Sequence, residues 1–219
     1  MSKEVDLLKN YPKSKRNTNE RAEVKTPEMI AIARQYGKEF FDGDRKHGYG
    51  GFSYNPRFWQ PVIPDMVEHF GLKAGMKVLD IGCAKGFMLH DMQELIPGIE
   101  LCGVDVSTYA IEQSMESVKS LLKVADAKQL PFEDNSFDVV ISINTIHNLD
   151  RDECAIALKE IERVGKGKAF ITVDAYRDDA EKQRMMEWAL TAKTIMSVDE
   201  WKLFFKEAGY TGDFYWFFP

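Results

Sequence analysis

Two acidic residues of this chain stand at the ends of apolar segments. Small residues follow the first of them and leave the backbone accessible to a ligand. Residues 78–86 read VLDIGCAKG, in which Asp80 lies near the end of an apolar run and Gly82 and Gly86 flank a tight turn. Small residues let the backbone approach a ligand closely, and the N–H groups of a following helix suit a carboxylate or phosphate. A second apolar segment ends in Asp105, and an acid in this place typically accepts hydrogen bonds from a ribose. The pattern therefore predicts a site for a ribose-containing ligand.

The segments that carry these acids read as the strands of an α/β domain. Apolar, strand-like segments lie at residues 77–81, 100–104, 121–125, 137–143 and 169–173. Helical patterns lie at residues 57–70, where prolines interrupt the start, and at 85–95, 107–119 and 151–164. Alternation of apolar strands with helices predicts a parallel sheet covered on both faces. Right-handed crossovers would place the ends of the first and fourth strands side by side.

Three further elements are expected after the fifth strand. Residues 178–190 have a helical pattern, and residues 197–208 begin like a capped helix with a carboxylate at the third helical position. Gly209 suits the position that ends this helix. The aromatic segment 213–218 reads as a sixth strand. Either the sheet ends at this strand, or another segment covers its exposed edge.

The N-terminal part divides into an arm, a helix and a loop. Residues 1–25 are polar, have little apolar periodicity and read as a solvated, partly disordered arm. A basic arm that grips an anionic substrate or RNA is the alternative. Thr26 and Pro27 signal the start of a helix, whose apolar stripe continues to Phe40. We expect this helix and the glycine-rich loop after it to form one region, residues 26–56.

The loop at residues 43–54 interleaves glycines with aromatic and charged side chains. Such a composition is incompatible with a regular helix or strand. Loops of this length in compact domains are usually functional or disordered. We therefore predict a lid or substrate-binding loop, with a surface loop packed by its own aromatic side chains as the alternative.

Composition limits the class of protein. The chain has 219 residues, 44% of them hydrophobic and 29% charged, which suits one α/β domain with a sizeable core. A net charge of −6 argues against a general nucleic-acid binder. No apolar run is long enough to span a bilayer, and no secretory signal is visible. Three cysteines, Cys83, Cys102 and Cys154, lack metal-ligand spacing and fit reduced thiols in a cytoplasmic protein.

Three ordered motifs carry a resemblance to a known family. They read VLDIGCAKG, then GVDVS at residues 103–107, then ADAKQLPFEDNSFDVVIS at residues 125–142. Together they resemble the class I S-adenosylmethionine-dependent methyltransferases, most closely the small-molecule branch related to quinone-biosynthesis enzymes. The resemblance implies a Rossmann-like fold and a methyltransferase domain over residues 57–219. Ala84 departs from the G-x-G-x-G turn of the family, but one methyl group without charge should leave cofactor binding intact.

The resemblance implies a set of residues for the cofactor, S-adenosyl-L-methionine. Asp80 and Gly82 would hold its methionine end, Asp105 its ribose hydroxyls and Asp126 its adenine amino group. The other cofactor-binding candidates are Cys83, Ala84, Gly86, Val106, Ala127 and Asn144. Lys85 is expected to be solvated. A nicotinamide-binding domain is the competing interpretation, but it needs G-x-G-x-x-G, and no third glycine stands in that place.

Methyl transfer from a sulfonium is an in-line displacement, so the protein aligns the reactants and excludes water. An oxygen acceptor also needs a group that removes its proton. His147 follows the fourth strand and aligns with a histidine frequent in this branch; it is a candidate base, or else a histidine that packs under the adenosine. Asp174 and Tyr49 are the other catalytic candidates. The substrate-binding candidates are Arg45, His47, Tyr49, Tyr54 and Tyr176.

These observations lead to one functional expectation. We expect methyl transfer to a small polar, anionic metabolite, with oxygen favoured as the acceptor atom and no metal required. The alternatives are an N- or C-methyltransferase, or a module that binds S-adenosylmethionine without turnover. An N-P-P-[YF] signature is absent after the fourth strand, which disfavours amino-methylation of nucleic-acid bases or glutamine. The expected partner is a small molecule rather than nucleic acid or membrane, and a homodimer stays open.

Overall fold

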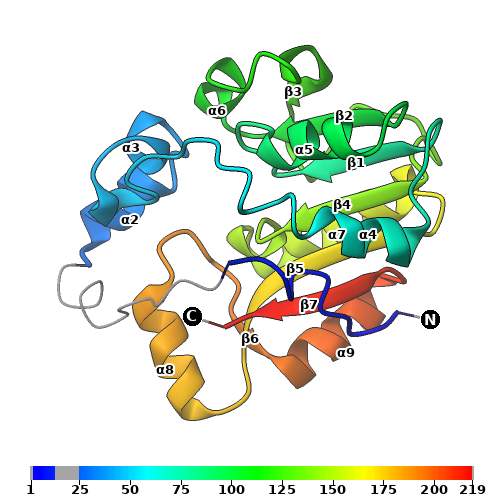
Figure 1. Ribbon diagram of the computed structural model, residues 1–219. Helices are drawn as coiled ribbons and strands as arrows, with labels where there is room; N and C mark the ends of the chain where they lie inside the picture. Colours follow the sequence, from blue (N-terminus) through cyan, green and yellow to red (C-terminus); the bar gives the residue numbers. More distant parts are fainter. Residues whose placement is uncertain (1, 13–24, 219) are drawn as a thin grey trace.

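The chain forms an α/β fold around one parallel sheet (Figure 1). The computed structural model describes residues 2–12 and 25–218, and within them seven strands form the sheet, in the order β3-β2-β1-β4-β5-β6, with β7 also paired to β5. Their bounds are β1 (Lys77–Ile81), β2 (Glu100–Asp105), β3 (Leu122–Val124), β4 (Val139–Ile143), β5 (Ala169–Tyr176), β6 (Met196–Ser197) and β7 (Asp213–Phe217). Neighbouring strands run parallel, and β1 lies between β2 and β4. The predicted parallel sheet, with the ends of its first and fourth strands adjacent, is confirmed.

Helices cover both faces of the sheet because successive strand residues point to opposite sides. On one face, Val78 and Ile141 pack with α4 (Ile63–Phe70) and α5 (Phe87–Leu95). On the other, Leu79 and Ile171 pack with α7 (Arg151–Val164) and α9 (Val198–Ala208). The other elements after residue 57 are α6 (Thr108–Glu112), α8 (Asp179–Trp188) and the short 3₁₀ turns η2 (Lys119–Leu121) and η3 (Ile146–Asn148).

Two predicted helices are shorter in the structure. The helix expected at 107–119 ends after Glu112, where the Ser114 hydroxyl donates to the carbonyl of Ile111 and competes with helical bonding. The helix expected at 57–70 begins only at Ile63, with Pro64 in its first turn, where a missing N–H costs nothing. By contrast, the capped start and glycine end predicted for α9 are confirmed, since Ser197 and Glu200 form a capping box and Gly209 is left-handed.

The N-terminal segment covers the free edge of β7. Val5 N–H donates to Phe214 O at 3.0 Å, and Phe214 N–H donates to Lys3 O at 3.0 Å. Leu7 is buried, with 4% of its surface exposed. The expectation of a solvated arm is therefore wrong for residues 2–12, and residues 13–24 lie outside the described residues. The alternative that another segment covers the exposed edge of the sheet is confirmed.

Residues 26–54, which we call the cap, lie beyond the carboxyl ends of the strands (Figure 1). The cap contains α2 (Pro27–Ala33), α3 (Lys38–Phe41) and the 3₁₀ turn η1 (Arg45–His47). Thr26 Oγ1 accepts from Met29 N–H, as the start signal predicts. One continuous helix to Phe40 was expected, but Tyr36 is left-handed, with φ 49°, and separates α2 from α3. None of the helices that the structure describes is long and apolar enough to cross a membrane.

Candidate functional site

The turn after β1 places three left-handed residues close together: Gly82 at φ 83°, Ala84 at φ 48° and Gly86 at φ 77°. The N–H groups of Gly82 and Cys83 donate to Val104 O at 2.8 and 3.1 Å, which joins the turn to β2. We expected Gly82 to make room for a ligand. The structure adds a second reason, because a Cβ atom on Gly82 would lie 2.0 Å from the Oγ1 atom of Thr145 after β4.

We predict that Gly82→Val disrupts the turn, whereas Ala84→Gly is tolerated. Valine at position 82 would meet Thr145 and adopt a backbone conformation that branched residues avoid, at a cost of about 3 kcal/mol or more. Glycine at position 84 relieves about 1 kcal/mol of left-handed strain but has more freedom in the unfolded chain, so the two effects nearly cancel. Urea denaturation and calorimetry with S-adenosylhomocysteine measure both variants. Equal stability and affinity for Gly82→Val and wild type would contradict this account of the turn.

Asp105 at the end of β2 organises the loops around the turn. Its two carboxylate oxygens accept from Ala84 N–H and Ser107 N–H, each at 2.8 Å. Burial raises the pKa of the Asp105 carboxyl, while the N–H groups of Ser107 and Ala84 act in the opposite direction. A carboxylate has about four acceptor positions, so Asp105 can accept from further donors. This donor–acceptor arrangement fits the two ribose hydroxyls that the sequence assigns to Asp105.

Asp80 is a buried carboxyl group, 4% exposed, on β1. Burial and the nearby charge of Asp105 raise its pKa to about 8. No side chain or N–H group in residues 2–12 and 25–218 donates a hydrogen bond to its carboxylate. A buried carboxyl group without hydrogen-bond donors is stabilised in its ionised form by a cationic partner. The ammonium group at the methionine end of the cofactor would provide this partner. The residues present therefore fit S-adenosylmethionine at both its methionine end and its ribose.

The raised pKa of Asp80 predicts that cofactor binding is linked to proton release. The pKa of Asp80 in the folded protein exceeds its value of about 4 in the unfolded chain. The protonated carboxyl group therefore stabilises the ligand-free fold fully below pH 4, and this contribution is lost as the pH rises through about 8. A bound ammonium group favours the carboxylate, so affinity should increase from pH 6 to pH 8 and up to about one proton should leave on binding. Calorimetry in buffers of different ionisation enthalpy measures the protons released. Asp80→Asn should release none, and equal release from both proteins would contradict the assignment.

Two further cofactor candidates, Val106 and Asp126, lie close to Asp105 in the chain or through β3. Ala125 N–H donates to Asp105 O at 3.0 Å, which brings the end of β3 next to β2. Asp126 then accepts from Lys128 N–H at 2.9 Å, with the Lys128 ammonium at 3.5 Å. Val106 is 57% exposed. An exposed apolar side chain beside an acid suits the face and amino group of an adenine, and Asp126 stays the predicted contact.

A histidine–aspartate pair joins the ends of β4 and β5. His147 on η3 is buried, its Nδ1 accepts from Asp174 N–H at 3.0 Å, and its Nε2 lies 3.6 Å from Asp174 Oδ1. Burial lowers the pKa of His147, so the neutral ring carries its proton on Nε2 and has no free lone pair. This bonding argues against His147 as the base. Nearby, Asn144 is left-handed, and its Oδ1 accepts from Thr172 Oγ1 at 2.8 Å.

Lys85 is buried rather than solvated, which corrects the sequence-based expectation. Its Nζ lies 2.6 Å from Asp42 Oδ2 and donates to Phe52 O at 2.9 Å, so it reaches into the cap. The Tyr109 hydroxyl donates to the same oxygen of Asp42 at 2.7 Å. Sequence reasoning missed Asp42 and Tyr109. The only local signal was a lysine two residues before the apolar start of α5 at Phe87.

The substrate-binding candidates do not converge on one place. Arg45 Nη1 donates to Tyr49 O at 2.8 Å, so these two lie together in the cap, and His47 lies 3.6 Å from Glu39. In contrast, the Tyr54 hydroxyl donates to Asp91 on α5 at 2.6 Å. The Tyr176 hydroxyl donates to Glu200 on α9 at 3.3 Å. Tyr49 is 44% exposed, and its ring packs against Phe41 and Phe52, as expected for a loop packed by its own aromatic side chains.

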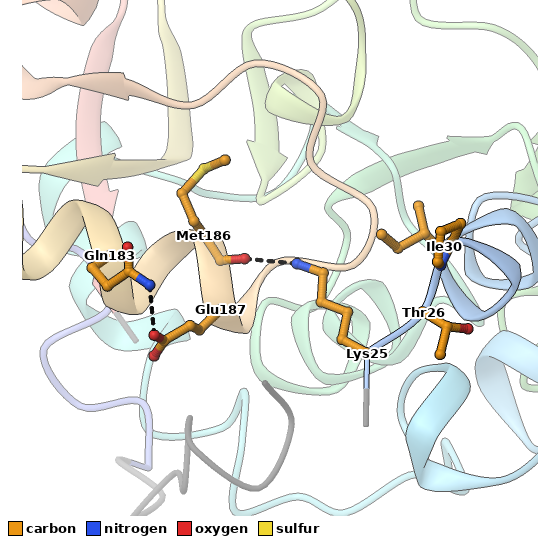
Figure 2. Close-up of a pocket in the computed structure, with 7 residues that line it drawn as sticks. Lys25, Thr26, Ile30, Gln183, Met186 and Glu187 are labelled. Carbon is orange, nitrogen blue, oxygen red and sulfur yellow. Dashed lines mark hydrogen bonds between the residues drawn. The ribbon is translucent and has the colours of Figure 1, made fainter. Parts of the chain in front are cut away.

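A cavity of about 300 Å³ lies between α8 and the start of α2 (Figure 2). It is lined by Lys25, Thr26, Pro27, Ile30, Gln183, Met186 and Glu187, none of them predicted site residues. Figure 2 shows Lys25 pointing to the carbonyl of Met186, to which its Nζ donates at 2.7 Å. The cavity therefore shares no lining residue with the loops that surround Asp80 and Asp105.

Comparison with known proteins agrees with the geometry of the strand ends. Residues 72–209 match a family model described as a methyltransferase domain. The chain is 33% identical over 161 residues to demethylmenaquinone methyltransferase of Staphylococcus aureus, covering 71% of this chain and 64% of that protein. It is 27% identical over 150 residues to 27-O-demethylrifamycin SV methyltransferase of Amycolatopsis mediterranei, covering 63% of this chain and 55% of that protein. The chain thus spans less than two thirds of the length of both relatives.

Solved structures agree on the fold. A chain in the complex of a methyltransferase with its activator from Haloferax volcanii matches with a TM-score of 0.58 and 23% identity. The match covers 84% of this chain and 77% of that one. The sequence motifs, the acids at the strand ends, the family model and the relatives lead to one assignment. The chain belongs to the class I S-adenosylmethionine-dependent methyltransferases, in the branch related to quinone-biosynthesis enzymes.

Proposed function

We propose that this chain transfers a methyl group from S-adenosylmethionine to an oxygen atom of a small polar, anionic metabolite. The observation that carries the choice of oxygen is the buried His147–Asp174 pair, which stands where β4 and β5 end. A hydroxyl acceptor needs its proton removed as it attacks, and such a pair suits that task. The name of the relative 27-O-demethylrifamycin SV methyltransferase supports oxygen as the acceptor atom. The other relative, demethylmenaquinone methyltransferase, is named for a different acceptor molecule.

The cofactor, when bound, supplies a methyl group already activated on a sulfonium. The work of the chain is then to bind, align and exclude water. Asp80 would pair with the ammonium group, Asp105 would accept from the ribose hydroxyls, and Asp126 would accept from the adenine amino group. Val106 would contact the adenine face.

We assign proton removal to Asp174 and orientation to His147. The Asp174 carboxylate faces the protonated Nε2 of a neutral imidazole, whose other nitrogen is held by Asp174 N–H. The acceptor hydroxyl would give its proton to the Asp174 carboxylate while the oxygen–methyl bond forms and the sulfur–methyl bond breaks. Tyr49, the third catalytic candidate, lies in the cap and would help to exclude water.

The basic turn η1 supports an anionic acceptor. Its residues Arg45 and Lys46 bring positive charge into the cap beyond the strand ends, and His47 stands next to them. Guanidinium and ammonium groups bind carboxylate and phosphate oxygens through charge-assisted hydrogen bonds. Tyr54 and Tyr176, which bind Asp91 and Glu200, lie apart from this turn and are assigned no substrate contact.

A screen of acceptors tests the proposal. Carboxylated, phosphorylated and nucleotide-linked metabolites are incubated with S-adenosylmethionine carrying a ¹³C-methyl group, and release of S-adenosylhomocysteine is followed. NMR of the product then identifies the atom that bears the methyl group. A methyl group on nitrogen or carbon would contradict the proposed acceptor atom. Tight cofactor binding without turnover on any acceptor would favour a binding module instead.

A further inference from the structure

Lys85 connects the cofactor turn to the cap through partly buried polar contacts. It stands between Ala84 and Gly86, and 9% of its side chain is exposed. Its Nζ contacts the Asp42 carboxylate at 2.6 Å and the carbonyl of Phe52 at 2.9 Å. Asp42 Oδ1 accepts from Phe52 N–H at 2.9 Å, so the start and the end of the glycine-rich loop meet at this one lysine.

The same carboxylate that would bind the ribose organises both attachments of the cap. Asp105 accepts from the N–H of Ala84, the residue directly before Lys85, and from the N–H of Ser107. Ser107 in turn donates through its Oγ to the carbonyl of Tyr36, the left-handed residue between α2 and α3, at 2.5 Å. A ligand on Asp105 therefore acts on two loops that each hold the cap.

The cap also contacts the opposite side of the strand ends. Arg34 Nη2 donates to the carbonyl of Ala192 at 3.0 Å, in the segment between α8 and β6. That segment is held at the site, because the N–H groups of Lys193 and Thr194 both donate to His147 O at 3.0 Å. The docked cap thus bridges the cofactor turn and the segment beside the histidine–aspartate pair.

We propose that Lys85 is a positioning residue through which cofactor binding and docking of the cap stabilise each other. A ligand that fixes the turn fixes the direction of the Lys85 side chain. The ion pair with Asp42 is partly buried, with 27% of the Asp42 side chain exposed, and its charge-assisted hydrogen bond depends on that direction. By linkage, the factor by which the ligand favours the docked cap equals the factor by which the docked cap favours the ligand. The inference rests on the cofactor site of the proposed function and concerns its regulation rather than its acceptor.

Limited trypsin digestion measures docking of the cap. The peptide bonds after Arg45 and Lys46 lie in η1, and their cleavage requires the cap to open. In the wild type, saturating S-adenosylhomocysteine should slow cleavage at these bonds about tenfold, within the usual range of allosteric coupling. In Lys85→Met, cleavage should be fast with or without the ligand, and affinity for S-adenosylhomocysteine should fall by about the same factor.

Two further variants separate coupling from stability. Lys166→Met removes a lysine that pairs with Asp138 at 2.9 Å at the other end of the strands, and it should keep full ligand protection. Asp42→Asn keeps the size of the side chain but removes its charge. This variant should lose ligand protection against trypsin as Lys85→Met does, and it replaces Lys85→Met in the test if the lysine variant fails to fold. The double variant should lose no more than either single variant.

The result that would overturn the inference is ligand protection in Lys85→Met or Asp42→Asn equal to that in the wild type. Absence of ligand protection in the wild type would also overturn it. A purely structural role for Lys85 would lower the midpoint of urea denaturation without changing the ratio of cleavage rates with and without ligand. The test needs no acceptor, so its failure would leave the proposal of methyl transfer standing.

Discussion

Replacement of Asp105 by alanine should abolish useful binding of S-adenosylmethionine while the protein stays folded. The ribose needs two acceptors inside a site where water cannot replace them, and Asp105 is also the acceptor for Ala84 and Ser107 N–H. Loss of charge-assisted hydrogen bonds to a partly buried carboxylate costs about 2–3 kcal/mol or more, which is a loss in affinity of about 30- to 150-fold. Calorimetry with S-adenosylhomocysteine measures the affinity, and urea denaturation checks the fold.

The matched control for this prediction is Asp152→Ala. Asp152 is an exposed acid in the first turn of α7, which follows β4 rather than the cofactor turn. It should leave the affinity for S-adenosylhomocysteine unchanged. Near-native affinity in folded Asp105→Ala would show that the ribose is held by other residues.

The elements that depend on local sequence could be predicted closely. β1 and α7 have the predicted bounds because a short apolar run and a capped amphipathic helix leave few alternatives. The two residues of β6 carry too little pattern to be recognised. The pairing of Val5 with Phe214 could not be predicted, since strand addition at a sheet edge depends on backbone groups that every sequence offers.

In the candidate site, too, the features set by local sequence could be predicted and the contacts between distant segments could not. The turn and its acids were predictable because they follow one another within a strand–turn–helix–strand unit, and the structure brings Asp80, Ala84 and Asp105 together. Contacts between distant segments were not predictable. Lys85 and Asp42 are 43 positions apart, and nothing in the residues around Lys85 indicates which acid it meets.

The histidine–aspartate pair shows what residue type alone leaves open. Both His147 and Asp174 were identified as catalytic candidates because they follow strands four and five. Which of the two can accept a proton depends on one hydrogen bond, from Asp174 N–H to Nδ1 of the ring. That bond joins residues 27 positions apart, so it follows from the parallel pairing of β4 with β5 rather than from either motif.

Replacement of Asp174 by asparagine should lower kcat for a hydroxyl acceptor by about 10²–10⁴-fold, the usual contribution of a positioned proton acceptor. Asparagine keeps the size of the side chain and the backbone N–H that binds His147, so the fold and the affinity for S-adenosylmethionine should be unchanged. The matched control is Asp179→Asn, which changes an exposed acid at the start of α8 and should keep full activity.

Acceptor acidity gives this prediction its sharpest test. If Asp174 removes the proton, the loss of kcat should shrink as the acceptor hydroxyl becomes more acidic, because an acceptor that is already ionised needs no base. Single-turnover kinetics with a series of acceptors of falling hydroxyl pKa measure this trend. A uniform loss across the series would assign Asp174 to alignment of the acceptor. A kcat above one tenth of the wild type, with an acceptor that ionises only weakly, would remove Asp174 from proton transfer altogether.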